Sequence, residues 1–309
     1  MKSKTDPQLV FLVGINLLVL LSASVLSKGA FIDPYNLQSM ASQLPELGLL
    51  AIGVMLAMSS GNGGIDLSGI ALANLSGVFS ATVVALFVNV EEAPLLFTLA
   101  FATIAICTGL VGGLVNGLLI ARLGLTPILC TLGTQLLFTG LAVVLSGGPS
   151  VRVGNADLLM EIGNGLFFGV PISFLIFLLI SLLVGAVLKY SPFGIRLFLM
   201  GTNPRAAHFA GFAQVRLLVT TYGLCGVMAG VKPEGGYGRM TCLFLSTTAL
   251  QLLSSMLNFL DLSNFFRDCA WGALLLIFLA FGRYELFARA QRLQFISWLR
   301  SPPAPKSHS

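Results

Sequence analysis

Charged residues are scarce in this chain of 309 residues: Asp, Glu, Lys and Arg make up 9% of it, and hydrophobic residues make up 56%. Soluble domains carry about 25% charged residues, because a soluble fold needs a polar surface. The same apolar content excludes a disordered chain. With a mean hydropathy of +0.93, the composition predicts an integral membrane protein.

Groups that perform catalysis or bind metals are also few. The chain has two histidines, His208 and His308, and neither has a metal-ligand neighbour at a useful spacing. No HExxH, GxSxG or Walker-type loop is present, which argues against an intramembrane protease or a self-powered pump. The five cysteines have no CxxC spacing and are interpreted as small buried hydrophobic residues. We therefore expect no enzyme, no metal site and no directly bound cofactor.

Long intervals without a charged residue predict the membrane spans, because a helix needs about 20 apolar residues to cross the hydrocarbon layer. The expected fold is an all-α polytopic membrane protein with 8–9 transmembrane helices, in two halves that each carry a glycine-rich broken-helix motif. The predicted spans are 8–27, 47–65, 67–90, 94–121, 126–147, 166–188, 240–260 and 265–282. The short interval 217–231 is expected to be partial or re-entrant, and 283–309 to form a basic cytoplasmic tail.

Basic residues predict the orientation, since they collect in cytoplasmic loops. The segment 189–216 holds four basic residues and no acidic one, whereas the turn at Glu91 and Glu92 has no basic one. We expect the first to face the cytoplasm and the second to face outward, with both termini cytoplasmic. This placement explains the excess of 17 basic over 12 acidic residues without a nucleic-acid partner.

A glycine-rich stretch, residues 59–69, interrupts the apolar pattern between the second and third spans. Asp66 lies within it, and a carboxylate near a membrane crossing is by default a functional candidate. The alternative is that Asp66 only caps a helix that restarts at Leu67. A second glycine interruption at 233–238 supports a transporter, in which broken helices line the substrate path. The candidate pathway residues are Asn62, Asp66, Ser68, Asn74 and Asn116.

Three glycines recur every four residues in the fourth span: Gly109, Gly113 and Gly117. This spacing places them on one helix face, where a second backbone can approach closely. The same face carries Asn116, which can bond to a neighbouring helix. Close helix packing is favoured over substrate contact for the glycines.

The loop after the sixth span contains a predicted short helix. Thr202 or Asn203 can cap it, and Pro204 suits its first position. Ala206, Ala207, Phe209 and Ala210 are expected to form a small apolar surface that Gly211 closes. Such a helix fits either a socket on a partner protein or a plain connection between two spans.

At these places the sequence resembles the permease subunits of bacterial ABC importers for sugars, of the ribose, xylose, arabinose and autoinducer-2 type. The resemblance covers roughly residues 10–290. The matching segments are 63–68 (GGIDLS), 115–121 (VNGLLIA), 125–127, 131–134, 201–207 (GTNPRAA) and 210–211. They succeed one another in the family's order, and they are specific as a set.

The resemblance implies a single transmembrane permease domain over 1–309 in the bacterial inner membrane, pairing as a homo- or heterodimer surrounded by lipid. It implies cytoplasmic ATPase subunits, which bind the ATP and magnesium, and an extracytoplasmic sugar-binding protein. It also implies an ATPase-coupling loop, made of Thr202, Asn203, Pro204, Arg205, Ala206, Ala207, Phe209 and Gly211. The expected function is import of a monosaccharide or a related small polar solute.

One departure from the family pattern occurs after Gly230, where 30 to 40 residues are missing before the Gly235–Gly236 turn. The resulting hypothesis is a shortened permease that transports poorly or not at all. A non-transporting or decayed permease paralogue is therefore one alternative. The other is a solute transporter driven by an ion gradient, which would need ionisable residues inside several spans.

Overall fold

The computed structural model describes residues 7–61, 63–147, 156–231, 248, 251–253 and 255–256. The chain divides into two compact units, 1–253 and 254–309, and the second contributes only Ser255 and Met256 to the described residues. The helical bundle lies in the first unit. The predicted spans 240–260 and 265–282 are almost wholly outside the described residues. The predicted tail and the second glycine interruption lie wholly outside them.

The described part of the first unit is almost entirely helical. Its long helices are α1 (Pro7–Leu26), α2 (Pro34–Ser59), α3 (Gly69–Phe87), α4 (Pro94–Leu123), α5 (Pro127–Ser146), α7 (Ile172–Tyr190) and α10 (Gln214–Val231). The shorter elements are η1 (Ala30–Ile32), α6 (Asp157–Asn164), α8 (Pro192–Thr202), α9 (Pro204–Phe209) and a two-residue hairpin, β1 (Leu166–Phe167) with β2 (Val170–Pro171). The all-α polytopic fold is confirmed. Within the described residues, six helices are long and apolar enough to cross a membrane.

Proline and glycine set many of the helix boundaries. Six of the described helices begin with proline, at Pro7, Pro34, Pro94, Pro127, Pro192 and Pro204. Proline is favoured there because its missing N–H has no partner to lose. The ends of α4 and α5 are followed by Gly124 and Gly147, which adopt the left-handed conformation.

Three of the observed helices begin at other residues than the predicted spans do. Helix α2 begins at Pro34 rather than at 47, because Glu46 is exposed and does not interrupt it. Helix α3 begins at Gly69 rather than at 67, with Ser68 as its N-cap. Helix α7 begins at Ile172 rather than at 166, because the preceding residues form the hairpin.

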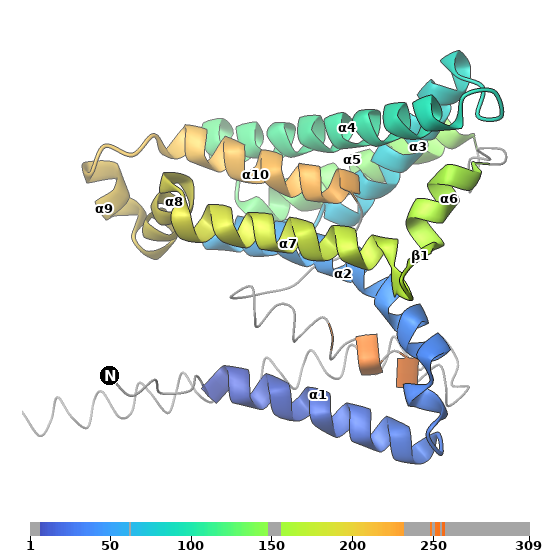
Figure 1. Cartoon of the computed structure of the whole chain (residues 1–309). Helices are drawn as coiled ribbons and strands as arrows, with labels where there is room; N and C mark the ends of the chain where they lie inside the picture. The colour runs from blue at the N-terminus through green and yellow to red at the C-terminus, as the bar shows by residue number, and fades with distance from the viewer. Residues whose placement is uncertain are drawn as a thin grey trace, which may run out of the picture. The chain divides into compact units, whose positions relative to one another are not determined.

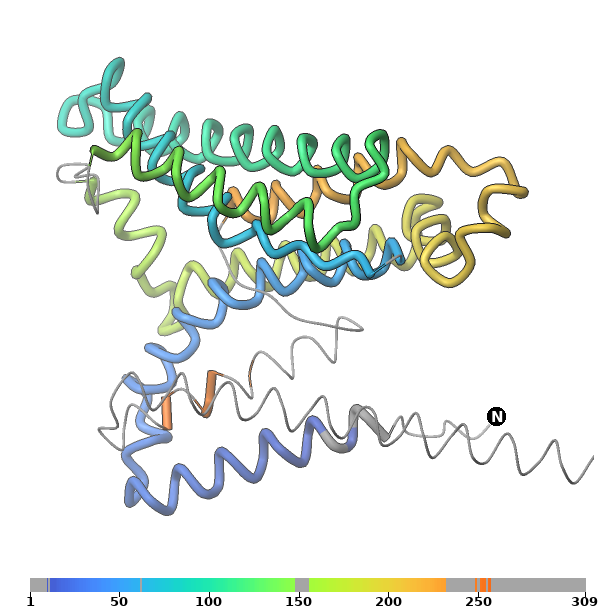
Figure 2. The backbone as a smooth tube through the Cα atoms, turned by 180° about the vertical axis from the view of Figure 1, so that it is seen from behind, coloured from blue at the N-terminus to red at the C-terminus, as the bar shows by residue number. Residues whose placement is uncertain are grey.

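The helix α10 covers the interval that was expected to be partial or re-entrant. It is continuous over 18 residues and does not turn back within them. It lies alongside α4 and also contacts α2 and α3 (Figures 1 and 2). Residues 232–247 lie outside the described residues, so a return of the chain after Val231 stays a prediction.

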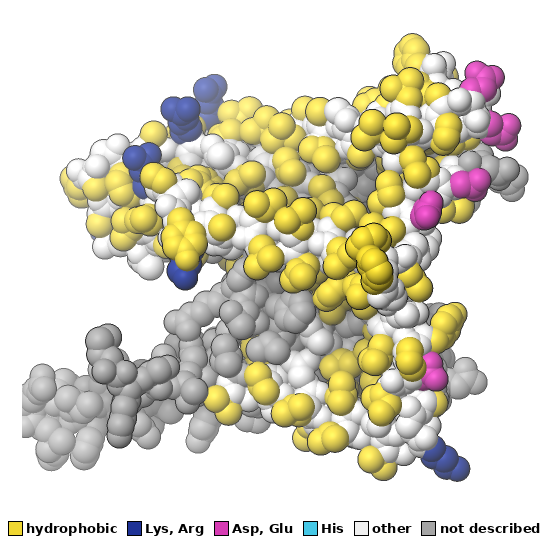
Figure 3. Space-filling model, viewed as in Figure 1, with side chains coloured by type: hydrophobic (Ala, Val, Ile, Leu, Met, Phe, Trp, Pro, Cys, Tyr) yellow, Lys and Arg dark blue, Asp and Glu magenta, His cyan; other side chains and the backbone are white. Residues whose placement is uncertain are grey.

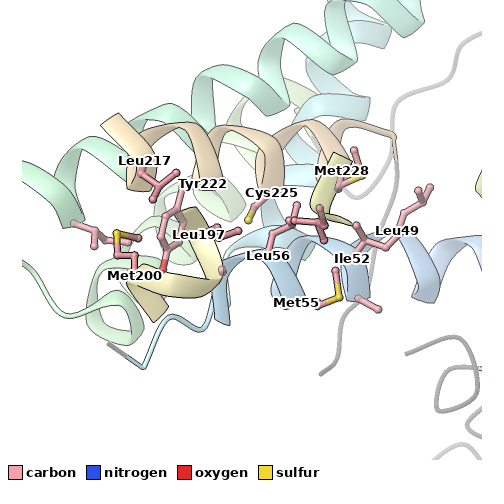
Figure 4. Close-up of a cluster of buried hydrophobic side chains, with 14 of the residues drawn as sticks. Leu49, Ile52, Met55, Leu56, Leu197, Met200, Leu217, Tyr222, Cys225 and Met228 are labelled. Carbon is pink, nitrogen blue, oxygen red and sulfur yellow. The ribbon is translucent and has the colours of Figure 1, made fainter. Parts of the chain in front are cut away.

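The largest hydrophobic core lies between α2, α7, α8 and α10. Figure 4 shows Leu56 of α2 close to Tyr222 and Cys225 of α10, and Leu197 and Met200 of α8 at one end of the cluster. Tyr222 and Leu197 are completely buried. In contrast, α5 and α7 expose most of their apolar side chains, as expected for helices that face lipid.

Among helices α3 to α10, basic and acidic side chains lie mostly at opposite ends (Figure 3), whereas Lys28, between α1 and η1, belongs to neither group. The end formed by α8 and α9 carries the basic residues Arg122, Lys189, Arg196, Arg205 and Arg216. The opposite end, made by the α3–α4 turn and by α6, carries the acidic residues Glu91, Glu92, Asp157 and Glu161. We call the basic end the α8–α9 end.

Candidate functional site

The chain leaves helical geometry between α2 and α3, over residues 60–61 and 63–68, which we name the break segment. Gly61 and Gly63 have φ angles of 80° and 66°, which strain any residue with a Cβ. Gly64 N–H donates to Gly61 O at 3.0 Å and Ile65 N–H donates to Gly63 O at 2.8 Å, so the segment folds into tight turns. The predicted glycine interruption is therefore a non-helical segment, and it joins two helices that are each long enough to cross a membrane. Asn62, a predicted pathway residue, lies outside the described residues.

Asp66 is buried at the end of the break segment, with 6% of its surface exposed. Its Oδ1 accepts hydrogen bonds from the Ser68 N–H at 3.0 Å and from the Ser68 hydroxyl at 2.7 Å. Asp66 has no ion-pair partner among the residues that the structure describes. Burial raises the pKa of the Asp66 carboxyl, and the two hydrogen bonds from Ser68 oppose that rise.

The Asp66 carboxyl does not cap the first turn of α3, as the capping alternative supposed. The helix begins at Gly69, and Asp66 instead bonds to the N-cap residue Ser68 itself. This arrangement fixes the geometry of the last turn before the helix. The function of Asp66 therefore depends on which other groups surround its carboxyl.

Two other helices join this polar group. Asn116 of α4 is completely buried, and its Nδ2 donates to the Ser68 hydroxyl at 2.7 Å. Thr131 of α5 is also buried; its hydroxyl accepts from the Leu67 N–H at 3.2 Å and donates to Pro127 O at 2.9 Å. The structure thus joins Asp66, Ser68 and Asn116, three of the predicted pathway residues, and adds Thr131. We name these four residues the polar cluster.

The polar cluster contains an unused acceptor. Asn116 Oδ1 is buried and has no hydrogen-bond partner among the described residues. A buried polar atom without a partner costs about 1–3 kcal/mol, so such atoms need an explanation. A water molecule or a hydroxyl of a polar solute could donate to it. Asn74, the remaining predicted pathway residue, is exposed on α3 and makes no contact with this cluster that the structure records.

Helix α4 meets α10 through backbone at the three predicted packing glycines. A Cβ placed on Gly113 would contact the Tyr222 carbonyl oxygen and lie 3.0 Å from Gly226 Cα. One on Gly109 would lie 2.9 Å from Gly230 Cα, and one on Gly117 would lie 2.7 Å from Val219 Cα. The two helices are therefore antiparallel and too close for any side chain between them.

Helices α8 and α9 form a folded unit at the basic end. Asn203 is the N-cap of α9, and its Oδ1 accepts from the Ala206 N–H at 2.9 Å. Gln214 Nε2 donates to Pro204 O at 2.6 Å, which ties the start of α9 to the start of α10. Gly211 has a φ of 76° and ends the turn after α9.

The exposed surface of α9 is smaller than the sequence predicted. Phe209 is 89% exposed, and Arg205 and Ala206 are exposed beside it. Ala207 is buried, because its side chain joins the hydrophobic core and anchors the helix there. A cavity of about 450 Å³ adjoins α9, and its lining includes Phe193, Arg196, Phe212 and Arg216.

These features occur in a segment that matches a known family. Residues 36–232, more than half of the chain, match the family described as branched-chain amino acid transport system / permease component. The chain belongs to this family. It is therefore a multi-pass inner-membrane permease subunit of an ABC importer and not an enzyme. Permeases of this family work with an ATPase and a substrate-binding protein.

Relatives of this permease include sugar importers. It is 28% identical to the ribose import permease protein RbsC of Bacillus subtilis, over 86% of this chain and 89% of that protein. It is 24% identical to the L-arabinose ABC transporter permease protein AraH of Azospirillum brasilense, over 87% of this chain and 86% of that protein. It is 32% identical to the autoinducer 2 import system permease protein LsrD of Klebsiella pneumoniae, over 70% of this chain and 64% of that protein. No solved structure matches the permease significantly.

The comparison with the ribose permease also bears on the length of the chain. The alignment of the two proteins has 299 positions. It covers 86% of the 309 residues of this permease, which is about 266 residues. About 33 aligned positions therefore have no counterpart in this permease. The comparison does not place these positions in one part of the chain, so the absence of 30 to 40 residues after Gly230 stays a prediction.

Proposed function

We propose that this permease imports a monosaccharide or a related small polar solute. The observation that carries the proposal is similarity over most of both chains to permeases named for ribose and for L-arabinose. The polar cluster supports it, because a buried acceptor such as Asn116 Oδ1 suits a solute rich in hydroxyl groups. The single buried carboxylate without an ion-pair partner among the described residues gives little support to an ion-gradient transporter.

The substrate path in this proposal passes the break segment. Broken helices in transporters place free backbone groups and polar side chains at the solute site. Asp66 and Asn116 would hold the geometry of the site, and the unpaired Asn116 Oδ1 would accept a solute hydroxyl. Asn62 and Asn74 remain candidates for the same path.

The assembly in this proposal is two permease chains, two cytoplasmic ATPase subunits and an extracytoplasmic binding protein. Lysines and arginines gather at the α8–α9 end, which supports a cytoplasmic position for that end. The coupling loop, from Thr202 to Gly211, would dock on the ATPase through α9. We also propose eight crossings with both termini cytoplasmic, in which the chain returns after α10. ATP and magnesium would bind to the ATPase and not to the permease.

Uptake of radiolabelled solutes by cells that lack their own pentose permeases tests the proposed function. The permease is expressed with its ATPase and binding protein, and D-ribose, L-arabinose and L-leucine are offered separately. We expect uptake of a pentose that disappears when the ATPase subunit is omitted, and no uptake of leucine. Leucine uptake without pentose uptake would contradict the sugar assignment.

The docking role of α9 predicts that two substitutions weaken assembly. Phe209→Asp places a charge on the most exposed aromatic side chain of α9, and Arg205→Glu reverses a charge beside it. Because buried aromatic anchors contribute about 2 kcal/mol or more to an interface, we expect co-purification of the ATPase to fall about tenfold or more. Phe168, 92% exposed in the hairpin after α6, provides a matched control. Phe168→Asp should leave co-purification unchanged, and full association of both α9 variants would remove the docking assignment.

A further inference from the structure

The break segment touches the α8–α9 unit through two glycines. A Cβ built on Gly61 would lie 2.8 Å from both the Cα and the carbonyl oxygen of Gly201. A Cβ built on Gly201 would collide with the carbonyl oxygen of Ser59, the last residue of α2. The two backbones are therefore in direct contact, although 140 residues separate them in the sequence.

Helix α8, which contains Gly201, is joined to α9 through the hydrogen bonds of Asn203. Asn203 N–H donates to Leu199 O of α8 at 3.1 Å, and Asn203 O accepts from the Ala207 N–H of α9 at 3.0 Å. Leu197 and Met200 pack into the core beside Leu56, so α8 faces α2 with its apolar side (Figure 4). Gly201 lies two residues before Asn203, so we expect a displacement of α9 to shift Gly201 as well.

The other end of the break segment is attached to the transmembrane helices α4 and α5. Asn116 bonds to Ser68, and Thr131 bonds to Leu67. Gly61, which makes the first attachment, and Gly63, which follows it, have positive φ angles that other residues rarely adopt. The segment is thus a short connection from the α8–α9 unit to the polar cluster.

We propose that the Gly61–Gly201 contact transmits movement of the coupling loop to the polar cluster, and thereby links ATP hydrolysis to solute passage. This inference rests on the proposed docking of α9 on the ATPase. Side chains at a contact can absorb small shifts by changing rotamer, whereas two backbones in contact cannot. Glycine is required at both positions because a methyl group would separate the two backbones.

Gly201→Ala tests the contact without backbone strain, because Gly201 lies in the last turn of α8 with an ordinary φ angle. The experiment uses the purified complex of permease, ATPase and binding protein in liposomes, and it measures the pentose transported per ATP hydrolysed. We expect this ratio to fall at least about fivefold, the size of a weak allosteric coupling, while the ATPase still co-purifies. Gly77→Ala is the control: Gly77 is also helical, has open space around it, and should leave the ratio unchanged.

If the Gly201→Ala protein does not reach the membrane, a second matched pair of variants tests the same contact. Gly61→Ala and Gly63→Ala impose similar strain at positive φ, but only Gly61 has a neighbour within 4 Å. We expect Gly61→Ala to lower the ratio at least fivefold more than Gly63→Ala. Equal ratios in the members of each pair would overturn the inference. Loss of ATPase association from the wild-type complex would instead refute the proposed function.

Discussion

Replacing Gly113 by leucine is expected to separate α4 from α10 and to remove most folded permease from the membrane. The added side chain would meet the Tyr222 carbonyl oxygen and the Gly226 backbone, which cannot rotate away. Adding volume to a packed interface costs about 1–3 kcal/mol for small insertions, and a whole leucine against backbone costs more. The measurement is the apparent melting temperature and the recovered amount of permease in detergent, by fluorescence-detected size exclusion.

Gly140→Leu is the control for this change. Gly140 is a helical glycine of α5 with nothing within 4 Å of its Cβ position, so a leucine there meets no backbone. We expect Gly140→Leu to retain the wild-type melting temperature within a few degrees. A Gly113→Leu protein as stable as the Gly140→Leu protein would show that α4 and α10 do not pack through their backbones.

The second large effect is expected for Asp66→Ala, which should lower solute uptake at least about tenfold. The substitution removes the acceptor of the Ser68 N–H and hydroxyl, and each buried donor left unpaired costs about 1–3 kcal/mol. Ser68 would then be free to turn, and Asn116 would lose the partner that orients it. The measurement is initial uptake of the transported pentose, normalised to the permease level in the membrane.

Asp66→Asn separates the charge from the hydrogen bonds, because its Oδ1 can still accept both bonds from Ser68. If Asp66 acts by holding Ser68 and Asn116 in place, the Asn variant should retain most of the uptake that the Ala variant loses. Equal loss in both variants at normal membrane levels would assign the function to the carboxylate itself. Loss of protein in the Ala variant alone, with normal uptake per molecule, would reduce Asp66 to a structural residue.

The sequence predicts local features of this permease well, because local chemistry determines them. Pro204 and Asn203 predict where α9 begins, and the structure shows Asn203 bonded to the Ala206 N–H. Absence of charge predicts helices near the observed positions of α3, α4 and α5. The spacing of Gly109, Gly113 and Gly117 predicts a close helix contact, although it does not name α10 as the partner.

Pairings between distant residues could not be predicted from a single sequence. The bond from Asn116 to Ser68 and the bond from Leu67 to Thr131 depend on the register in which α4 and α5 pack against the break segment. Thr131 belongs to a segment that resembles the family, but nothing in the sequence indicated that its hydroxyl would bond to the break segment. The contact of Gly61 with Gly201 was missed for the same reason, because an interrupting glycine gives no indication of its neighbour.

The close contact between α4 and α10 has a consequence for the biogenesis of the permease. Over an 18-residue window, the mean hydropathy of α10 is 1.2, the lowest among the six candidate spans, whereas that of α4 reaches 2.2. A segment of such low hydropathy partitions weakly into lipid by itself. Helix α4 is synthesised about 100 residues earlier, and it presents its groove of glycines until α10 emerges. We infer that α10 packs against the glycines of α4 as it leaves the translocon, and that this contact holds α10 in the membrane. Larger residues at these glycines would then prevent the insertion of α10, and transport would be lost for that reason.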